Sequence, residues 1–203
     1  MDLGSSISRG VERLLGHVKR EDTKYRTYGT LSAVLVLLLF HVVFVFAEVV
    51  GDAGVFMTVG AGWLEGDLPY VRYIDHKPPG IYAVLAATFA VERSVFGAKI
   101  VVLLVNIATA GVVYQVGRRL FTNSAALGAV LLFLTGSLVY DGAKVYTEPF
   151  VALASMLAVV GFLAGERTGL RRHYAAAGLL TGIAIVFKQP GGALLLGFLV
   201  YLL

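Results

Sequence analysis

One feature constrains this chain more than any other: the apolar run Leu31–Val50, which follows a polar start. A transmembrane helix needs about 20 mainly apolar residues to cross a hydrocarbon core about 30 Å thick. A cleavable signal peptide instead has an apolar core of roughly 7–15 residues. We therefore predict that Leu31–Val50 is a first transmembrane helix that is retained in the protein.

Further apolar runs follow along the whole chain, at about 98–117, 124–140, 146–164, 174–187 and 191–203. Charged residues make up only 15% of the sequence, whereas soluble domains carry about 25%. Membrane β-strands would alternate polar and apolar residues over about 10 positions, and these runs are unbroken. The sequence therefore predicts an all-α fold, a multi-pass transmembrane helical bundle with about six spans.

The short apolar run Ile81–Val91 decides the topology. At about 1.5 Å per residue it does not cross a core about 30 Å thick. If it rests at the outer interface and the N-terminus is cytoplasmic, Arg118-Arg119 and Arg167–Arg172 both lie inside, as the positive-inside rule favours. If it crosses, both clusters lie outside. We therefore predict that it does not cross.

The sequence divides into two parts. In residues 1–28, apolar residues at helical spacing alternate with arginines and lysines, which predicts a cytoplasmic amphipathic segment on the membrane surface. The alternative is a solvated helical extension. Residues 29–203 form the predicted transmembrane module, and we expect it to be truncated at its C-terminus because the last apolar run continues to Leu203. Cysteine is absent, which excludes disulfides and thiolate metal sites.

The predicted outer face carries the polar residues of chemical interest. They are Asp52, Glu65, Asp67, Asp75, His76, Lys77, Asp141, Lys144, Glu148 and Lys188. Most belong to the segment from Glu48 to Gly80, the longest stretch that does not span, in which we also predict a short juxtamembrane helix around Val55 to Trp63.

Three groups in this segment suggest chemistry. Asp52 lies where a helix meets water, and a partly desolvated carboxylate there would be a better general base; the alternative is a simple interfacial acid. Lys77 is suited to holding a phosphate, or else contacts lipid headgroups. Asp75 and His76 offer oxygen and nitrogen ligands to a divalent cation, although two ligands alone are weak evidence for a metal.

The order of these motifs resembles a known family. The resembling segments are Asp52, Gly66-Asp67-Leu68-Pro69-Tyr70, Asp75-His76-Lys77-Pro78-Pro79-Gly80-Ile81-Tyr82, Arg118-Arg119-Leu120-Phe121, Tyr146-Thr147-Glu148-Pro149-Phe150 and Gly182–Gln189. Together they resemble the N-terminal portion of GT-C glycosyltransferases, in particular the dolichyl-phosphate-mannose–protein mannosyltransferase and lipid A aminoarabinose transferase superfamily. The resemblance runs from about Gly29 to Leu203.

The resemblance implies roles for individual residues. It implies that Asp52 is the catalytic base, and that Lys77, with Lys188 and Lys99 as further candidates, binds the donor phosphate. It implies that Asp75, His76, Tyr82 and Glu148 line the substrate cavity, and that Asp75 and His76 are candidate ligands of a divalent metal ion. The alternative for Lys188 is to cap the carbonyls at the end of its helix.

The resemblance also has departures. Ala53 follows Asp52 where many members have a second acid, and Lys99 stands near the place where many have an arginine. Family chains are usually longer, with more spans and often a further outer domain. An acceptor-recognising half would then be missing, and we therefore expect this chain to be an incomplete fragment of the enzyme.

The implied function is a membrane glycosyltransferase that moves a sugar from a polyprenyl-phosphate donor to a protein, lipid or glycan acceptor at the extracytoplasmic face of the cell membrane. Membrane lipids are the other expected partners, and nucleic acid is not expected. Two alternatives stay open: a transporter, which would place ionisable groups near the bilayer centre, and a non-catalytic subunit that binds lipid-linked sugar.

Overall fold

The computed structural model describes residue 24 and residues 27–203, and the regular elements of this part are all helices, with no strand. The predicted amphipathic segment 1–28 lies almost entirely outside the described residues. After a first helix, Thr27–Val45, the elements are α2 (Asp52–Leu64), α3 (Gly80–Val91), α4 (Val95–Leu120), α5 (Asn123–Val139), α6 (Glu148–Thr168), α7 (Arg171–Phe187), the 3-10 helix η1 (Gln189–Gly192) and α8 (Ala193–Leu202).

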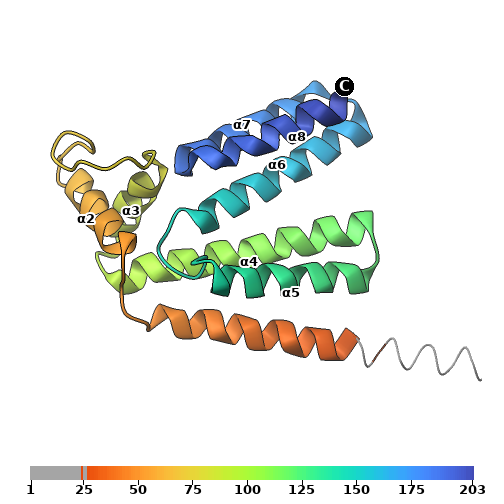
Figure 1. Cartoon of the computed structure of the whole chain (residues 1–203), viewed down its shortest axis with the longest axis horizontal. Coiled ribbons are helices and arrows are strands. Elements are labelled where there is room, and N and C mark those ends of the chain that lie inside the picture. Colours follow the sequence, from red (N-terminus) through yellow and green to blue (C-terminus); the bar gives the residue numbers. More distant parts are fainter. Residues whose placement is uncertain (1–23, 25–26) are drawn as a thin grey trace, which may run out of the picture.

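The helices form a bundle with a short helical pair at one end. Figure 1 shows the first helix, α4, α5, α6, α7 and α8 running roughly along one direction, with α2 and α3 together at the end where α4 begins. The short run Ile81–Val91 therefore lies within α3 beside α2, and the chain does not traverse the bundle through it. That this run does not cross the membrane stays a prediction.

Three helices are long and apolar enough to cross a membrane: Thr27–Val45, Val95–Leu120 and Glu148–Thr168. Gly80–Val91, Asn123–Val139 and Gln189–Leu202 are apolar but shorter. The all-helical class is confirmed, and the count of about six spans stays a prediction.

The first helix ends earlier than predicted, at Val45 instead of Val50. The backbone amides of Phe46 and Ala47 bond to carbonyls three residues back, at 3.0 and 3.2 Å, which tightens the last turn and ends the helix. The Ala47 carbonyl then accepts a hydrogen bond from Lys99 of α4. The chain is thereby redirected toward α2, and Glu48 lies outside the helix.

The main apolar core holds α2 and α3 against the ends of the long helices. Phe56 of α2 and Tyr82 of α3 meet edge-on, 6.1 Å between ring centroids, and Phe150 of α6 stacks on Phe187 of α7 at 5.0 Å. Gly80 permits a close approach here, because a Cβ on it would lie 2.7 Å from the carbonyl oxygen of Val186. The start of α3 is therefore fixed against the end of α7.

The two ends of the bundle carry different basic residues. We call the end with α2 and α3 the site end, and the opposite end the arginine end (Figure 1). Arg118 and Arg119 lie in the last turn of α4, Arg167 lies in the last turn of α6, and Arg171 and Arg172 begin α7. The lysines that the sequence singled out lie at the site end.

Candidate active site

Asp52 is the first residue of α2 and follows a turn that requires glycine. Gly51 has a φ of 63°, and a Cβ on it would lie 2.6 Å from the hydroxyl of Tyr146. The Asp52 carboxylate occupies the first turn of α2, where the helix dipole favours negative charge. Its side chain is 60% exposed, so the chain itself covers Asp52 little, and the partial desolvation at the membrane surface stays a prediction.

Lys77 lies in the loop that enters α3, directly before Pro78 and Pro79. Its ammonium nitrogen is 3.6 Å from Oδ2 of Asp52 and 6.0 Å from the centre of the Phe56 ring. The side chain is only 17% exposed. An ammonium group has three N–H donors, and within the described residues Lys77 makes no side-chain hydrogen bond. The group is thus covered, charged and only loosely paired.

A second ion pair joins α6 to the end of α7. Glu148 is the first residue of α6, and its Oε1 accepts a hydrogen bond of 2.5 Å from Nζ of Lys188, which follows α7. The Thr147 hydroxyl donates to Oε2 at 3.1 Å. Lys188 therefore binds a carboxylate 40 residues away in sequence, and the alternative in which it caps its own helix is not what the structure shows.

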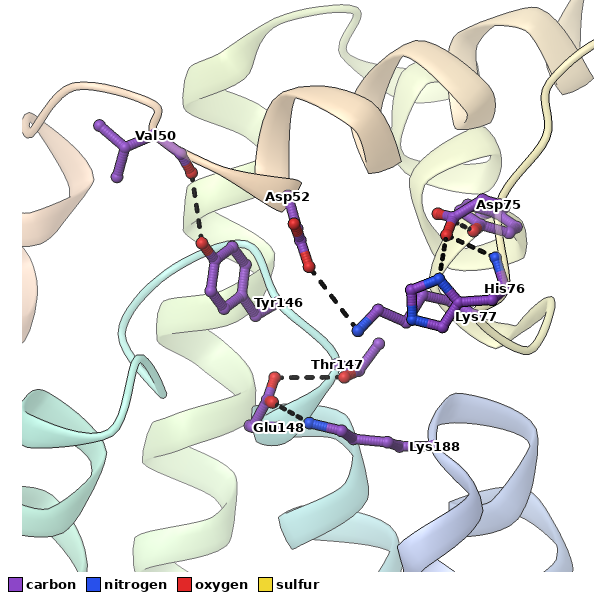
Figure 2. Close-up of polar contacts among 10 residues, drawn as sticks. Val50, Asp52, Asp75, His76, Lys77, Tyr146, Thr147, Glu148 and Lys188 are labelled. Carbon is purple, nitrogen blue, oxygen red and sulfur yellow. Dashed lines mark hydrogen bonds and ion pairs between the residues drawn. The ribbon is translucent and has the colours of Figure 1, made fainter.

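The two ion pairs belong to one packed region (Figure 2). Phe56 contacts the ammonium group of Lys77 on one side and the ring of Tyr146 on the other, 6.2 Å between centroids. Tyr146 directly precedes Thr147 and Glu148, and its hydroxyl donates to the Val50 carbonyl at 3.4 Å. Tyr146 and Phe56 were not among the predicted site residues, although Tyr146 belongs to one of the quoted motifs.

A tyrosine–carboxylate network holds the loop that carries Lys77. Tyr82 donates to Oδ2 of Asp75 at 2.5 Å, and the backbone N–H of His76 donates to Oδ1 at 2.6 Å. Burial alone would raise the pKa of Asp75, but these hydrogen bonds outweigh it and lower the pKa below its ordinary value. Burial and the bond to Asp75 raise the pKa of Tyr82, which keeps its hydroxyl protonated as a donor.

Tyr70 fixes the same loop from the other side. Its hydroxyl donates to the backbone carbonyl of Lys77 at 2.6 Å, and its ring meets that of Tyr82 edge-on, 6.1 Å between centroids. Tyr70 has a φ of 69°, a left-handed conformation that is costly for a residue with a side chain. Burial, together with the charge of Asp75, raises the pKa of Tyr70. Tyr70 belongs to one of the quoted motifs but was not among the predicted site residues.

The residues proposed as metal ligands fit a metal poorly. Both carboxylate oxygens of Asp75 already accept hydrogen bonds, and His76 is an exposed side chain whose Nδ1 lies 3.3 Å from Asp75 Oδ1. The part of the chain that the structure describes contains no group of three or more histidine and acidic side chains placed to hold a metal ion. The metal site stays a prediction.

Lys99 is separated from the Asp52–Lys77 pair. It is buried at the start of α4 and donates to the Ala47 carbonyl. It lines a cavity of about 220 Å³ with Glu48 and Lys144, and the residues around this cavity do not include Asp52, Lys77 or Glu148. The structure therefore does not bring Lys99 together with the other predicted phosphate ligands.

The comparison with known proteins gives the family. The sequence model of the dolichyl-phosphate-mannose-protein mannosyltransferase family matches residues 76–203, more than half of the 203-residue chain. The chain belongs to this family. No curated protein and no solved structure matches it. The matched residues include Lys77, Glu148 and Lys188, whereas Asp52 precedes them.

Membership in this family makes the protein a membrane glycosyltransferase of the GT-C type. The site end of the bundle contains an exposed carboxylate in Asp52, a covered ammonium group in Lys77 and a second acid–lysine pair in Glu148 and Lys188. They come from α2, the loop before α3, the start of α6 and the end of α7.

Proposed function

We propose that the protein transfers a sugar from a polyprenyl-phosphate donor to an acceptor hydroxyl, and that the reaction takes place at the site end, facing outside the cell. The observation that carries the proposal is the state of Lys77. Three other lysines at this end are already satisfied by strong partners: Lys99 by a carbonyl, Lys144 by Asp141 at 2.5 Å and Lys188 by Glu148 at 2.5 Å.

Lys77 differs from these three. Its side chain is covered, its nearest carboxylate is 3.6 Å away, and it donates no hydrogen bond within the described residues. Removing a charge from water is costly unless the charge is paired and hydrogen-bonded. A phosphate oxygen would supply the missing acceptor, and an ammonium group is a common partner for phosphate.

The reaction assigns complementary tasks to Lys77 and Asp52. The acceptor oxygen attacks the anomeric carbon of the donor sugar, and the bond from that carbon to the phosphate oxygen breaks. The electron pair of the broken bond stays on the lipid phosphate, whose growing charge Lys77 stabilises. Asp52 takes the proton of the acceptor hydroxyl. Because Asp52 is 60% exposed, an acceptor can reach it from the aqueous side.

Glu148 and Lys188 form the other wall of the proposed site. Their hydrogen bond leaves the pair with little net charge, so Lys188 is a weaker candidate than Lys77 for the phosphate. The Thr147 hydroxyl holds the second oxygen of Glu148, which orients the carboxylate. We propose that this pair positions the sugar and that Lys77 alone holds the phosphate.

The proposed orientation follows the basic residues. Five arginines, Arg118, Arg119, Arg167, Arg171 and Arg172, lie at the end opposite the site. The positive-inside rule places that end in the cytoplasm, and the site end then faces outside. In this arrangement a lipid-linked donor reaches the site from within the membrane.

The transporter alternative has less support. Within the described residues, His41 is a buried ionisable side chain inside a spanning helix, which is often a sign of a transport path. Both of its ring nitrogens have partners, however: the Leu37 carbonyl at 2.8 Å and the Ser137 hydroxyl at 2.5 Å. His41 therefore ties the first helix to α5.

The test is sugar transfer in membranes that contain the protein, with a polyprenyl-phosphate mannose labelled in the sugar as the probe. We expect Lys77→Ala to lower the rate about 10²–10³-fold, the loss typical of removing one preorganised charge-stabilising donor. We expect a loss of about 10²–10⁴-fold for Asp52→Asn, typical of a missing general base.

Lys144→Ala is the matched control, because it removes a lysine of the same end that is bonded to Asp141; we expect its rate to stay near that of the wild type. Wild-type rates in Lys77→Ala and Asp52→Asn would overturn the proposal, provided that both insert normally. Donor binding without transfer in the wild-type protein would instead favour the non-catalytic subunit.

A further inference from the structure

The arginine end contains a cavity that the proposed reaction does not use. It has a volume of about 570 Å³ and lies between α4, α6 and α8. Its walls are apolar apart from Arg119, Glu166, Arg167 and Tyr201. A groove with an apolar wall and with arginines among its lining residues suggests a ligand with an anionic head and an apolar tail.

The spacing of the lining residues gives the groove a direction. Val160, Leu163 and Ala164 lie on one face of α6, and Arg167 continues that face into its last turn. On α4, Val116 and Leu120 flank Arg119, again within the last turns. The arginines therefore lie where these helices end, and the apolar walls extend from them along the helices.

Neither arginine has an acidic partner in the part of the chain that the structure describes. Within residues 27–203, Arg119 and Arg167 make no ion pair and no side-chain hydrogen bond, and both are exposed. The acid of the groove is engaged elsewhere, because Oε1 of Glu166 accepts a hydrogen bond of 2.7 Å from Tyr174. The two guanidinium groups are free to bind an anion.

The third wall of the groove is held by aromatic packing. Phe162 of α6 stacks on Phe198 of α8 at 4.3 Å and meets Tyr201 edge-on at 5.4 Å. This packing places Tyr201 beside the apolar stripe of α6. Tyrosine is common at the headgroup level of membranes, which is the level expected for the arginine end.

We propose that this groove binds an anionic phospholipid, with the headgroup phosphate at Arg119 and Arg167 and one acyl chain along Val160, Leu163 and Ala164. Arginine binds phosphate with paired N–H donors, and basic pockets between transmembrane helices are known sites for anionic lipid headgroups. The inference does not rest on the proposed sugar transfer, because the groove lies at the other end of the bundle.

The experiment measures lipid binding to the purified full chain in an uncharged detergent, with phosphatidylglycerol as the probe and phosphatidylcholine as its zwitterionic counterpart. We expect the wild type to prefer phosphatidylglycerol. Each arginine near a surface contributes enough affinity that Arg119→Gln with Arg167→Gln should weaken phosphatidylglycerol binding about 30-fold.

The matched control is Arg171→Gln with Arg172→Gln, which removes the same charge at the same end but from residues outside the groove. We expect this control to bind as the wild type does. A third variant, Ala164→Phe, keeps both arginines and fills the apolar wall, and we expect it to lose phosphatidylglycerol binding as well. Circular dichroism and elution volume check that each variant is folded.

Three results would overturn the proposal: equal binding of the two lipids, equal losses in the two double variants, or undiminished binding in Ala164→Phe. Dimers of the wild type that Ala164→Phe disrupts, without lipid binding, would assign the groove to a second copy of the chain and overturn the lipid assignment too. If the Arg119→Gln and Arg167→Gln variant loses binding but Ala164→Phe does not, the lipid is attracted only to surface charge and does not occupy the groove.

Discussion

The two ends of the bundle use basic residues in different ways. At the site end, Lys99, Lys144 and Lys188 each donate to a protein oxygen, and Lys77 is covered beside Asp52. At the arginine end, Arg119 and Arg167 are exposed and have no acidic partner within the described residues. The comparison suggests that the site end fixes individual charges in place, whereas the arginine end presents charge to its surroundings.

The backbone shows the same contrast. The site end contains α2, α3 and loops in which Tyr70 and Asp141 adopt positive φ values of 69° and 63°. At the arginine end the chain only turns: Thr122 caps α5 by accepting from the Ala125 amide at 3.2 Å, and Gly169 ends α6 in the left-handed conformation. Strain is tolerated where surrounding contacts hold a functional geometry.

The largest effect in this comparison should come from the contact between α3 and α7. We expect Gly80→Ala to lower stability by about 1–3 kcal/mol, the usual cost of overpacking, because its Cβ would lie 2.7 Å from a backbone oxygen of Val186. Thermal unfolding in detergent measures the loss, and sugar transfer should fall with it because Lys77 precedes this contact.

Gly178→Ala is the control, because it adds the same methyl group to α7 nearer the arginine end, where nothing lies within 4 Å. Alanine favours a helix over glycine by about 1 kcal/mol, so this variant should be neutral or slightly more stable. If both variants unfold at the same temperature, the site end is not the tightly packed region that the contacts indicate.

A smaller loss of stability should distinguish Glu148 at the site end from Glu166 at the arginine end, two acids that each accept a hydrogen bond. Glu148→Gln removes the charge that Lys188 bonds at 2.5 Å. Hydrogen bonds to charged groups contribute about 1.5–3 kcal/mol to stability. The side chains of Glu148 and Lys188 are each more than a third exposed, 37% and 34%. Solvent screening therefore reduces the expected loss of stability to about 1 kcal/mol.

Glu166→Gln is the counterpart at the arginine end, where the partner is the neutral hydroxyl of Tyr174. We expect its unfolding midpoint to stay close to that of the wild type. Combining Glu148→Gln with Lys188→Gln completes a double-mutant cycle, and the coupling between the two changes gives the strength of the pair. A coupling of zero would show that the interaction between Glu148 and Lys188 does not stabilise the folded protein.

Much of this contrast was predictable from the sequence, for a physical reason. Apolar runs report which segments must avoid water, and helix length then decides which of them can cross a membrane. The short run Ile81–Val91 and the arginines at 118–119 and 167–172 were enough to predict that α3 stays at one end. The same topology argument assigned the polar residues of the site end to one face of the membrane.

The partners within the site were less predictable. The bond from Lys188 to Glu148 spans 40 residues, and the contact of Lys99 with Ala47 spans 52. Such pairs depend on how the helices rotate and pack, and a hydropathy pattern does not specify rotation. The family resemblance grouped Lys99 with the phosphate ligands, although it belongs to another contact. Phe56 was missed because its role is to lie between Lys77 and Tyr146.

The smallest effect concerns two tyrosines that donate to carboxylates, Tyr82 to Asp75 at the site end and Tyr174 to Glu166 at the arginine end. The pKa of Asp75 is lowered in the folded protein from its ordinary value of 3.8. A lowered pKa means that the charged carboxylate contributes stability above that ordinary value, and that the contribution is lost as the pH falls through the lowered pKa. Tyr82→Phe removes the hydroxyl and leaves the burial, so the pKa of Asp75 should rise.

Hydrogen exchange of the loop from residue 66 to residue 80 is the measurement. At neutral pH we expect Tyr82→Phe to make the loop easier to open by about 1 kcal/mol, the net contribution of one hydrogen bond. The difference from the wild type should shrink as the pH falls through the lowered pKa of Asp75, because below it the carboxyl is protonated in both proteins. Tyr174→Phe should leave exchange in this loop unchanged at every pH. If Tyr82→Phe does not differ from the wild type, Tyr82 holds the loop by ring packing alone. A difference that is independent of pH would show that the charge of Asp75 has no part in positioning Lys77.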